Sequence, residues 1–470
     1  MQQTKEIKST GETTLIKAYF NEKRDYFDQG NTLSYSFRKE MLKRLEAGIQ
    51  EHEAEIFRAL NSDLGKSETE SYFTEVGIVK AEIAYALKNL RQWMKPQRRS
   101  TPLSLEPSKS ELRYDPKGVV LIIAPWNYPF NLIFAPLVGA VAAGNTVVLK
   151  PSEDAPATAA ITEKIISKLF KPEYISVVQG EGSKVVPLLL KNHVFNHVFF
   201  TGSPEVGKTI AKQASDNLVS TTLELGGKSP SIVDSSANLK VAAKRLVWGK
   251  FINAGQTCVA PDYLLIEAKI KDRFTDLLIE NIKTFYGSDA QQSADYPRLI
   301  NEKRFDAVTG YLKTGNIVYG GKSDKSDLYI EPTLIDEVDL ESPLMREEIF
   351  GPVFPIIPFT DGHQILDIVR KNRYPLACYY FGSNKSYKDL ILNQLSFGGG
   401  CINNTLFHLG NPDLPFGGVQ SSGSGHYHGW HSFECFSNSK SLVISKTWFD
   451  PAMKYPPFNQ SKLNWLRKLF

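Results

Sequence analysis

Cys258 lies where a nucleophilic thiol would be useful. It sits in the sequence NAGQTCVAP (253–261), between a helical pattern and the apolar run YLLIE (263–267). A reactive thiolate needs an accessible loop, and nearby backbone N–H groups can stabilise an oxyanion. A buried, inert thiol is the alternative for any cysteine, but that role suits Cys378 better because Cys378 lies in a strand pattern. Cys258 is therefore the candidate nucleophile.

Glu224 and Asn127 could supply the polar groups that such a nucleophile needs. Glu224 is flanked by leucines and followed by two glycines in TLELGGK (222–228). An apolar setting raises the pKa of a carboxyl group and suits a general base, whereas a solvated strand-end charge is the alternative. Asn127 follows the apolar run VVLIIA (119–124), at a strand end where α/β proteins bind ligands. An asparagine at a strand end can also be a turn residue that binds no ligand.

The segment 202–209 (GSPEVGKT) satisfies the phosphate-loop pattern G-x-x-x-x-G-K-[ST]. It follows the apolar run HVFFT (197–201) and opens a helical pattern. Such a turn can hold a nucleoside triphosphate, with Asp234 as magnesium ligand, or the pyrophosphate of a dinucleotide at a helix N-terminus. The spacing alone leaves both interpretations open, as well as a turn without a ligand.

Lys150 and Glu153, in LKPSE (149–153), follow another strand pattern. Together they could hold the two hydroxyls of a ribose, and the carboxylate would repel a 2′-phosphate. A surface ion pair is the alternative. The three histidines of GHYHGWHS (425–432), His426, His428 and His431, do not complete a familiar ligand set, so no metal is expected.

Hydrophobic periodicity predicts the elements that would position these residues. Apolar residues at helical spacing predict amphipathic helices over about 32–60 and 76–93. Short β-branched runs then alternate with helical patterns. The expected strands are 118–126, 145–151, 174–180, 197–202 and 230–234, and the expected helices are 133–143, 158–169, 183–190 and 206–214. Because parallel strands need long crossovers, this alternation predicts a parallel, doubly wound sheet.

The alternation resumes after Asp234, which predicts a second α/β unit. Its expected helices are 237–248 and 270–285, and its expected strands are 263–267, 317–321 and 353–359. The segments 96–116 and 419–446 are rich in residues that disfavour helices, and both look extended. They could pair as a small β appendage.

Length and composition narrow the class of protein. A chain of 470 residues allows about three domains at ~150 residues each. Lys and Arg number 55 against 51 Asp and Glu, and this net charge of +4 argues against a nucleic-acid partner. Four cysteines without C-x-x-C spacing fit a reducing compartment. No secretory leader is recognisable, and the apolar stretch 131–144 is shorter than the ~20 residues needed to span a bilayer, so a cytoplasmic protein is expected.

Seven motifs in this order resemble the aldehyde dehydrogenase superfamily. They are PWNYP (125–129), VVLKPSE (147–153), FTGSPEVGK (200–208), LELGGKSP (223–230), NAGQTCVAPDY (253–263), EEIFGPV (347–353) and LPFGGVQSSG (414–423). The resemblance spans about residues 33–458. The stretch WGKFINAGQTCVAPDYLL (248–265) is similar to the class 3 and fatty aldehyde dehydrogenase branch. This resemblance favours the dinucleotide interpretation of 202–209.

The resemblance implies a fold as well as an activity. It implies an α/β protein with a Rossmann-like NAD(P)-binding domain, a catalytic α/β domain, a small β bridging element that makes a homodimer, and a C-terminal tail. The implied boundaries are 1–96 with 117–222, then 223–418, then 97–116 with 419–446, and 447–470.

The same resemblance implies a role for each candidate residue. Cys258 would attack the aldehyde carbon, and the Asn127 amide with the Cys258 backbone N–H would hold the oxyanion. After hydride transfer to NAD(P)⁺, Glu224 would activate water to hydrolyse the thioester. The implied cofactor residues are Lys150 and Glu153 at the adenosine ribose, Gly202, Ser203 and Gly207 at the pyrophosphate, and Glu348 and Phe350 at the nicotinamide. Glu153 favours NAD⁺, with NADP⁺ as the second choice.

The substrate side is expected to be apolar. Tyr72, Trp126 and the loop 403–409 are its candidate residues, and an aromatic lining favours medium-chain to long-chain aliphatic or aromatic aldehydes. The basic, amphipathic tail 462–470 (KLNWLRKLF) is expected to cover the substrate entrance or to touch a membrane surface.

Three other functions are weighed against this one. A nucleoside triphosphatase would use 202–209, and a non-catalytic protein could bind lipid surfaces. A CoA-acylating aldehyde dehydrogenase would differ only in the acyl acceptor, and Glu224 argues for water.

Overall fold

The β-branched runs of the first half form one six-stranded sheet. The computed structural model describes residues 12–469 and orders this sheet β17-β7-β6-β3-β4-β5, with every strand parallel except β17. The strands are β3 (Val119–Ile123), β4 (Thr146–Lys150), β5 (Ile175–Val177), β6 (His197–Thr201), β7 (Ser220–Glu224) and β17 (Gly423–Ser424). The predicted doubly wound parallel sheet is confirmed, but the strand expected at 230–234 lies in the second sheet, and 220–224, which was not predicted as a strand, takes the place next to β6.

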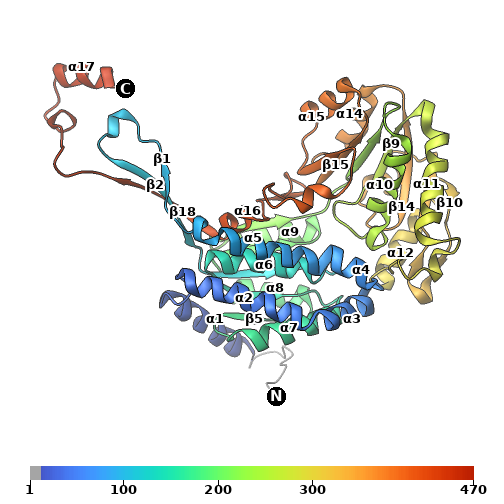
Figure 1. Cartoon of the computed structure of the whole chain (residues 1–470), viewed down its shortest axis with the longest axis horizontal. Helices are drawn as coiled ribbons and strands as arrows, with labels where there is room; N and C mark the ends of the chain where they lie inside the picture. Colours follow the sequence, from blue (N-terminus) through green and yellow to red (C-terminus); the bar gives the residue numbers. More distant parts are fainter. Residues whose placement is uncertain (1–11, 470) are drawn as a thin grey trace.

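Helices cover both faces of this sheet (Figure 1). They are α1 (Glu12–Asp28), α2 (Tyr35–Glu51), α3 (Glu53–Leu64), α4 (Glu68–Ser71), α5 (Gly77–Trp93), α6 (Asn131–Ala143), α7 (Pro156–Leu169), α8 (Gly182–Asn192) and α9 (Pro204–Ser215), with a π-helical turn, η1 (Tyr72–Val76), before α5. Side chains alternate across β3 because a strand has a period of two. Val120 and Ile122 pack with α2, α5 and α6, whereas Val119 and Leu121 pack with α1, α8 and α9.

Two features of the helical layer differ from the sequence prediction. The helix expected over 32–60 is two helices, α2 and α3, because the chain leaves helical geometry at His52 (φ −102°, ψ 10°). Helix α1 was not predicted because charged and polar residues obscure its pattern. Its Phe20 nevertheless lies in the core beside α8.

The second half forms a seven-stranded sheet in the order β10-β13-β14-β9-β8-β15-β16, parallel except for β10. Its strands are β8 (Pro230–Val233), β9 (Tyr263–Glu267), β10 (Asn316–Tyr319), β13 (Thr333–Asp336), β14 (Val353–Phe359), β15 (Ala377–Phe381) and β16 (Gly399–Ile402). Its helices are α10 (Leu239–Phe251), α11 (Lys271–Tyr286), α12 (Glu302–Tyr311), α13 (Pro343–Arg346), α14 (Gly362–Lys371) and α15 (Lys385–Gln394), and a short hairpin joins β11 (Ser323–Asp324) to β12 (Tyr329–Ile330). This sheet and its helices make the second lobe, at the right of Figure 1.

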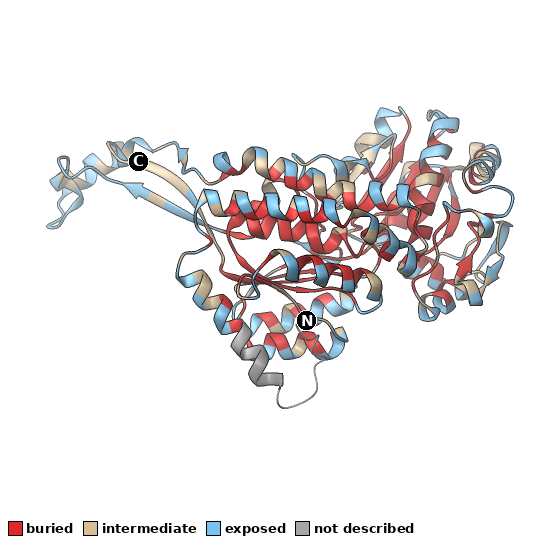
Figure 2. Ribbon diagram, turned by 60° about the horizontal axis from the view of Figure 1, so that its bottom comes forward, coloured by how far each residue is buried: buried red, intermediate tan, exposed pale blue. Residues whose placement is uncertain are grey.

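A three-stranded antiparallel sheet projects from the first lobe (Figure 1). Its strands are β1 (Gln97–Arg99), β2 (Lys109–Pro116) and β18 (Ser437–Ile444), and α17 (Gln460–Leu469) follows β18. We call residues 97–116 and 437–469 the appendage. Most of it is exposed, whereas the central strands in both lobes are buried (Figure 2). Helix α17 lies at the outer end of the appendage, so it does not cover the cleft of its own chain.

Only part of 419–446 joins the appendage. Residues 423–424 pair with β7 instead, and 430–435 form the helix α16 (Trp430–Cys435), although the sequence looked extended there. Aromatic packing explains the helix, because Phe433 is fully buried against Trp93. Helix α16 also lies so close to α6 that a Cβ on Gly139 would be 2.6 Å from the Ser432 Cβ.

Across residues 12–469, the helices are all too short or too polar to cross a bilayer.

Candidate active site

A cleft of about 750 Å³ is lined by both lobes at the carboxyl ends of β6 and β7. Ligands of parallel α/β sheets bind at this end of the strands. Eight predicted site residues line it: Trp126, Asn127, Gly202, Ser203, Glu224, Cys258, Glu348 and Phe350. The other four, Tyr72, Lys150, Glu153 and Gly207, do not line it.

Cys258 follows a strained turn after α10. Asn253, Ala254 and Gly255 all have positive φ, at 52°, 50° and 76°. Residues other than glycine rarely adopt this conformation, and at position 255 a Cβ would lie 2.3 Å from the Gly351 carbonyl oxygen. Surrounding hydrogen bonds hold the turn, because Glu70 Oε1 accepts the Asn253 N–H at 2.9 Å. The backbone that leads to Cys258 is therefore held by contacts within the protein.

Gln256 anchors the same loop to the second lobe. Its Nε2 donates to the Arg298 carbonyl at 3.0 Å, and its Oε1 accepts the Ile300 N–H at 3.0 Å. The side chain is fully buried, so these bonds form away from water.

The surroundings of Cys258 disfavour its thiolate form. Burial raises its pKa to about 12, and the carboxylates of Glu348 and Glu224 add to the shift. A neighbouring positive charge or base would be needed to form the thiolate.

Asn127 joins the two lobes at the cleft. The side-chain Nδ2 of Asn127 donates to the Gln256 backbone carbonyl at 3.0 Å. The backbone carbonyl of Asn127 accepts from Asn253 Nδ2 at 2.8 Å and from Lys66 Nζ at 3.1 Å. A side-chain amide carries two N–H groups. One is held by Gln256, which orients the amide and leaves the second N–H for a ligand.

Glu224 is the last residue of β7 and only 2% exposed. Within residues 12–469, neither carboxylate oxygen has a hydrogen-bond partner. Burial raises the pKa of this carboxyl well above its ordinary value. The side chain is therefore not a solvated strand-end charge, and it has the properties of a group that acts on a ligand or a water molecule.

Glu348 and Phe350 face the cleft from the second lobe. Burial raises the pKa of the Glu348 carboxyl to about 8, and the Asp262 carboxylate adds to the rise. Phe350 has a φ of 48° and lies edge-on to Trp126, with ring centroids 5.4 Å apart.

Three residues that sequence analysis missed hold this segment. Lys228 Nζ bonds Asp262 Oδ2 at 2.5 Å and the Glu347 carbonyl at 2.9 Å, while Asp262 Oδ1 accepts the Ile349 N–H at 3.0 Å. Arg304 donates to the Ile349 carbonyl at 2.9 Å. Lys228 and Asp262 fall inside two of the recognised motifs, so their charges in apolar surroundings were an available signal. Arg304 lies outside the motifs, and no feature of the sequence pointed to it.

The residues outside the cleft have identifiable positions. Lys150 Nζ lies 2.5 Å from Glu153 Oε2 at the end of β4, and Glu153 Oε1 accepts the Gly182 N–H at 2.6 Å. A Cβ on Gly207 would lie 2.7 Å from Leu225, so glycine lets α9 approach β7 closely. Tyr72 is 46% exposed at the start of η1.

The structure does not support a triphosphate-binding loop at 202–209. Helix α9 begins at Pro204, with Ser203 as its N-cap, so most of the pattern is helical. Lys208 is exposed on this helix and does not line the cleft. The pattern match is therefore a coincidence of sequence.

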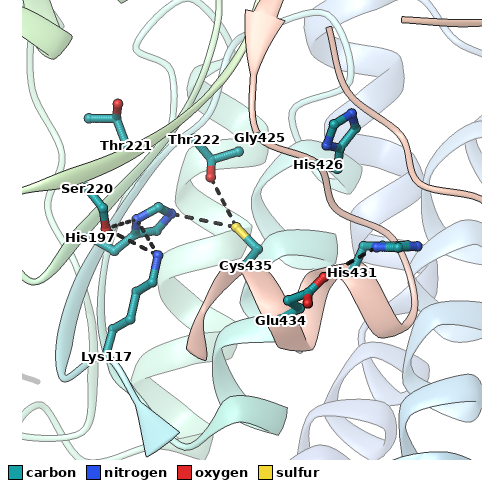
Figure 3. A pocket seen from close by; sticks show the side chains of 10 residues that line it. All are labelled: Lys117, His197, Ser220, Thr221, Thr222, Gly425, His426, His431, Glu434 and Cys435. Carbon is teal, nitrogen blue, oxygen red and sulfur yellow. Dashed lines mark hydrogen bonds and ion pairs between the residues drawn. The ribbon is translucent and has the colours of Figure 1, made fainter. Parts of the chain in front are cut away.

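A second hollow of about 260 Å³ lies at the opposite ends of the strands (Figure 3). In it His197 Nδ1 is 2.8 Å from Ser220 Oγ, and His197 Nε2 is 3.6 Å from Cys435 Sγ. His197 and Ser220 begin β6 and β7, so this hollow is at the amino ends, away from Glu224. Among the described residues, no group of three or more His, Cys, Asp or Glu side chains is placed to hold a metal ion.

Comparison with known proteins identifies the family. A model of the aldehyde dehydrogenase family matches residues 3–442. The 4,4'-diaponeurosporen-aldehyde dehydrogenase of Staphylococcus aureus is 45% identical over 459 residues, which cover 97% of this chain and 99% of that protein. The dimeric NADP-preferring aldehyde dehydrogenase of Rattus norvegicus is 41% identical over 436 residues, 92% of this chain and 96% of that one. A solved structure, the substrate-bound state of Staphylococcus aureus AldH, has a TM-score of 0.94 at 45% identity and covers 97% of this chain and 99% of its own. This chain therefore belongs to the aldehyde dehydrogenase family, and it is an oxidoreductase that oxidises aldehydes with NAD⁺ or NADP⁺.

Proposed function

We propose that this enzyme converts apolar aldehydes to carboxylic acids through a thioester on Cys258. The observation that carries the proposal is the single cleft that collects Cys258, Asn127 and Glu224 from three distant segments. A nucleophile, an oriented amide donor and a buried carboxylate without a partner are the groups that acyl transfer to water requires.

Each residue has one task in this proposal. The Cys258 sulfur forms a bond to the aldehyde carbon as the carbonyl π electrons move to oxygen, and the thiol proton passes to water in the cleft. The second Asn127 N–H and the Cys258 backbone N–H stabilise that oxyanion. NAD(P)⁺, when bound, would accept a hydride from that carbon, and the oxyanion would re-form the carbonyl to leave a thioester on Cys258. Glu224 then takes a proton from water, whose oxygen attacks the thioester carbon, and the carbon–sulfur bond breaks to release the acid.

The cleft has the features that a dinucleotide needs. Residues 202–205 line it at the start of α9, where unsatisfied N–H groups and the helix dipole favour a pyrophosphate. Lys150 and Glu153 would hold the adenosine ribose, and Glu348 with Phe350 would hold the nicotinamide end. On this arrangement the six-stranded lobe binds the cofactor and the seven-stranded lobe carries the nucleophile.

Aromatic side chains near the cleft support an apolar substrate. Trp126 lines the cleft, and Tyr72 presents an exposed ring at η1. Phe73, next to Tyr72 in η1, has an exposed ring that lies edge-on to Trp248, and so has Phe407, with ring centroids 5.9 Å apart in both pairs. Such surfaces favour medium-chain to long-chain aliphatic or aromatic aldehydes.

The appendage supports a homodimer. Its sheet order leaves one side of the eight-residue strand β18 unpaired, and Val443 and Ile444 are 54% and 46% exposed. Long edge strands with exposed apolar residues pair readily with another chain. The partner that we propose is a second copy of this chain.

Helix α17 supports contact with an anionic membrane surface. Leu463 and Trp465 are partly exposed on it, and Lys462, Arg467 and Lys468 accompany them. A basic amphipathic helix with tryptophan binds the membrane interface through its apolar face and its charges.

Two substitutions separate the chemical steps. Cys258→Ser should abolish NADH formation and leave NAD⁺ binding intact. Glu224→Gln should give a burst of about one NADH per site and then slow turnover by about 10²–10⁴-fold, because water is no longer deprotonated. Stopped-flow absorbance with straight-chain aldehydes of increasing length measures both, and wild-type kcat/KM should rise with chain length.

The pH dependence of turnover tests whether Glu224 acts as a base. Because the base acts only when deprotonated and its pKa is raised, wild-type turnover should fall as the pH falls, and this dependence should vanish in Glu224→Gln. Glu280→Gln, an exposed carboxylate on α11 that does not line the cleft, is the control. A Glu224 variant without a burst would contradict the assignment.

Glu153 should set the choice of nucleotide. Two like charges about 4 Å apart near a protein surface repel by about 4 kcal/mol, so Glu153→Gln should raise kcat/KM for NADP⁺ relative to NAD⁺ at least about tenfold. Steady-state kinetics with both nucleotides test this. Glu181→Gln, on the adjacent loop, should leave the ratio unchanged, and an unchanged ratio in Glu153→Gln would refute the role.

The homodimer should depend on β18. Light scattering should give about twice the 52.7 kDa mass of the chain, and the pair of substitutions Val443→Glu and Ile444→Lys should shift it toward the single chain. Both side chains are already exposed, so unfolding temperature should change little. A wild-type protein that stays monomeric at micromolar concentration would disprove the interface.

Removing residues 462–470 should weaken vesicle binding. The full chain should sediment with anionic phosphatidylserine vesicles at low salt, and the shortened chain should not. Short-chain aldehyde kinetics should be the same for both proteins. Equal sedimentation of the two would dispose of the membrane contact.

A further inference from the structure

We propose that the buried ion pair Lys66–Glu75 is a positioning device for Asn127. The inference rests on the oxyanion role proposed for Asn127. Lys66 lies between α3 and α4, and Glu75 lies in η1. Both side chains are fully buried, and Lys66 Nζ lies 2.5 Å from Glu75 Oε1.

Lys66 acts on the backbone of the Asn127 loop. Its Nζ donates to the Asn127 carbonyl at 3.1 Å and lies 4.1 Å from the centre of the Tyr128 ring. The same carbonyl accepts from Asn253, so two donors from different parts of the chain fix this peptide. Fixing the peptide fixes the Cα from which the Asn127 amide projects.

Glu75 holds the other end of the same loop. Its Oε2 accepts the N–H groups of Phe130 and Asn131, each at 2.9 Å, where α6 begins. A carboxylate at a helix N-terminus satisfies free N–H groups and complements the helix dipole. Asn127 therefore lies between two anchored points, its own carbonyl and the start of α6.

The local backbone is shaped for these contacts. Glu75 lies in a π-helical turn, and such turns are rare and frequent at functional sites. A buried ion pair is seldom a net source of stability, because removing two charges from water offsets their attraction. The clearest role of this pair is therefore to hold the Asn127 loop through the hydrogen bonds that both side chains make to its backbone.

The test removes both charges together, because one unpaired buried charge would itself destabilise the protein. Lys66→Met with Glu75→Gln should lower the rate of the NADH burst about 10–100-fold, because a displacement of about 1 Å at a reacting group can have an effect of that size. The NAD⁺ dissociation constant should stay within about twofold. Lys66→Gln with Glu75→Gln, which keeps a hydrogen bond, is the second variant if the first unfolds.

The decisive measurement compares the effect of the double substitution on the burst rate in the wild-type protein and in Asn127→Ala. If Lys66 and Glu75 act through Asn127, the double substitution should have almost no further effect on the burst rate in Asn127→Ala. A full additional loss there, or a wild-type burst rate in the double variant, would overturn the positioning role alone. A wild-type burst rate in Asn127→Ala would instead overturn the proposed oxyanion donor, and the positioning role with it. Lys80→Met, which breaks a partly exposed pair with Glu53 in the same helical layer, is the matched control.

Discussion

The hydrogen bonds between the Asn127 loop and the turn that precedes Cys258 tie the two lobes together at the cleft. Asn127 follows a strand of the six-stranded sheet, whereas Asn253 and Gln256 follow a helix of the seven-stranded lobe. No shared sheet fixes the distance between them. Reacting groups need placement to within a fraction of an ångström, and this reciprocal bonding places side chains of both lobes in one site.

A second constraint is the burial of the acidic side chains at the site. Burial raises the pKa of Glu224 and Glu348 and of the Cys258 thiol, so three acidic groups share a space in which none ionises readily. Close by, Lys228 and Asp262 form a fully bonded buried pair. Lys228 and Asp262 hold a loop, whereas Glu224 lines the cleft with no hydrogen-bond partner among the described residues.

The sequence was informative where pattern and chemistry coincide. Strand and helix alternation predicted two α/β units because each crossover carries its own periodicity, but it assigned 230–234 to the first sheet and did not predict β7, β13 or β16. The motifs contain Cys258, Asn127 and Glu224, which line one cleft. Other features depend on tertiary contacts that no local pattern carries. The break at His52, the helix α16 held by Phe433, and Arg304 are of this kind. The phosphate-loop pattern at 202–209 does not mark a triphosphate site, because the spacing of residue types does not show where a helix begins.

The raised pKa of Cys258 has a consequence for the lifetime of the resting enzyme. Burial raises the pKa of this thiol, and thiolates rather than thiols react with peroxides and alkylating agents. An enzyme whose substrates are electrophiles thus keeps its own nucleophile in the less reactive thiol form while the cleft is empty.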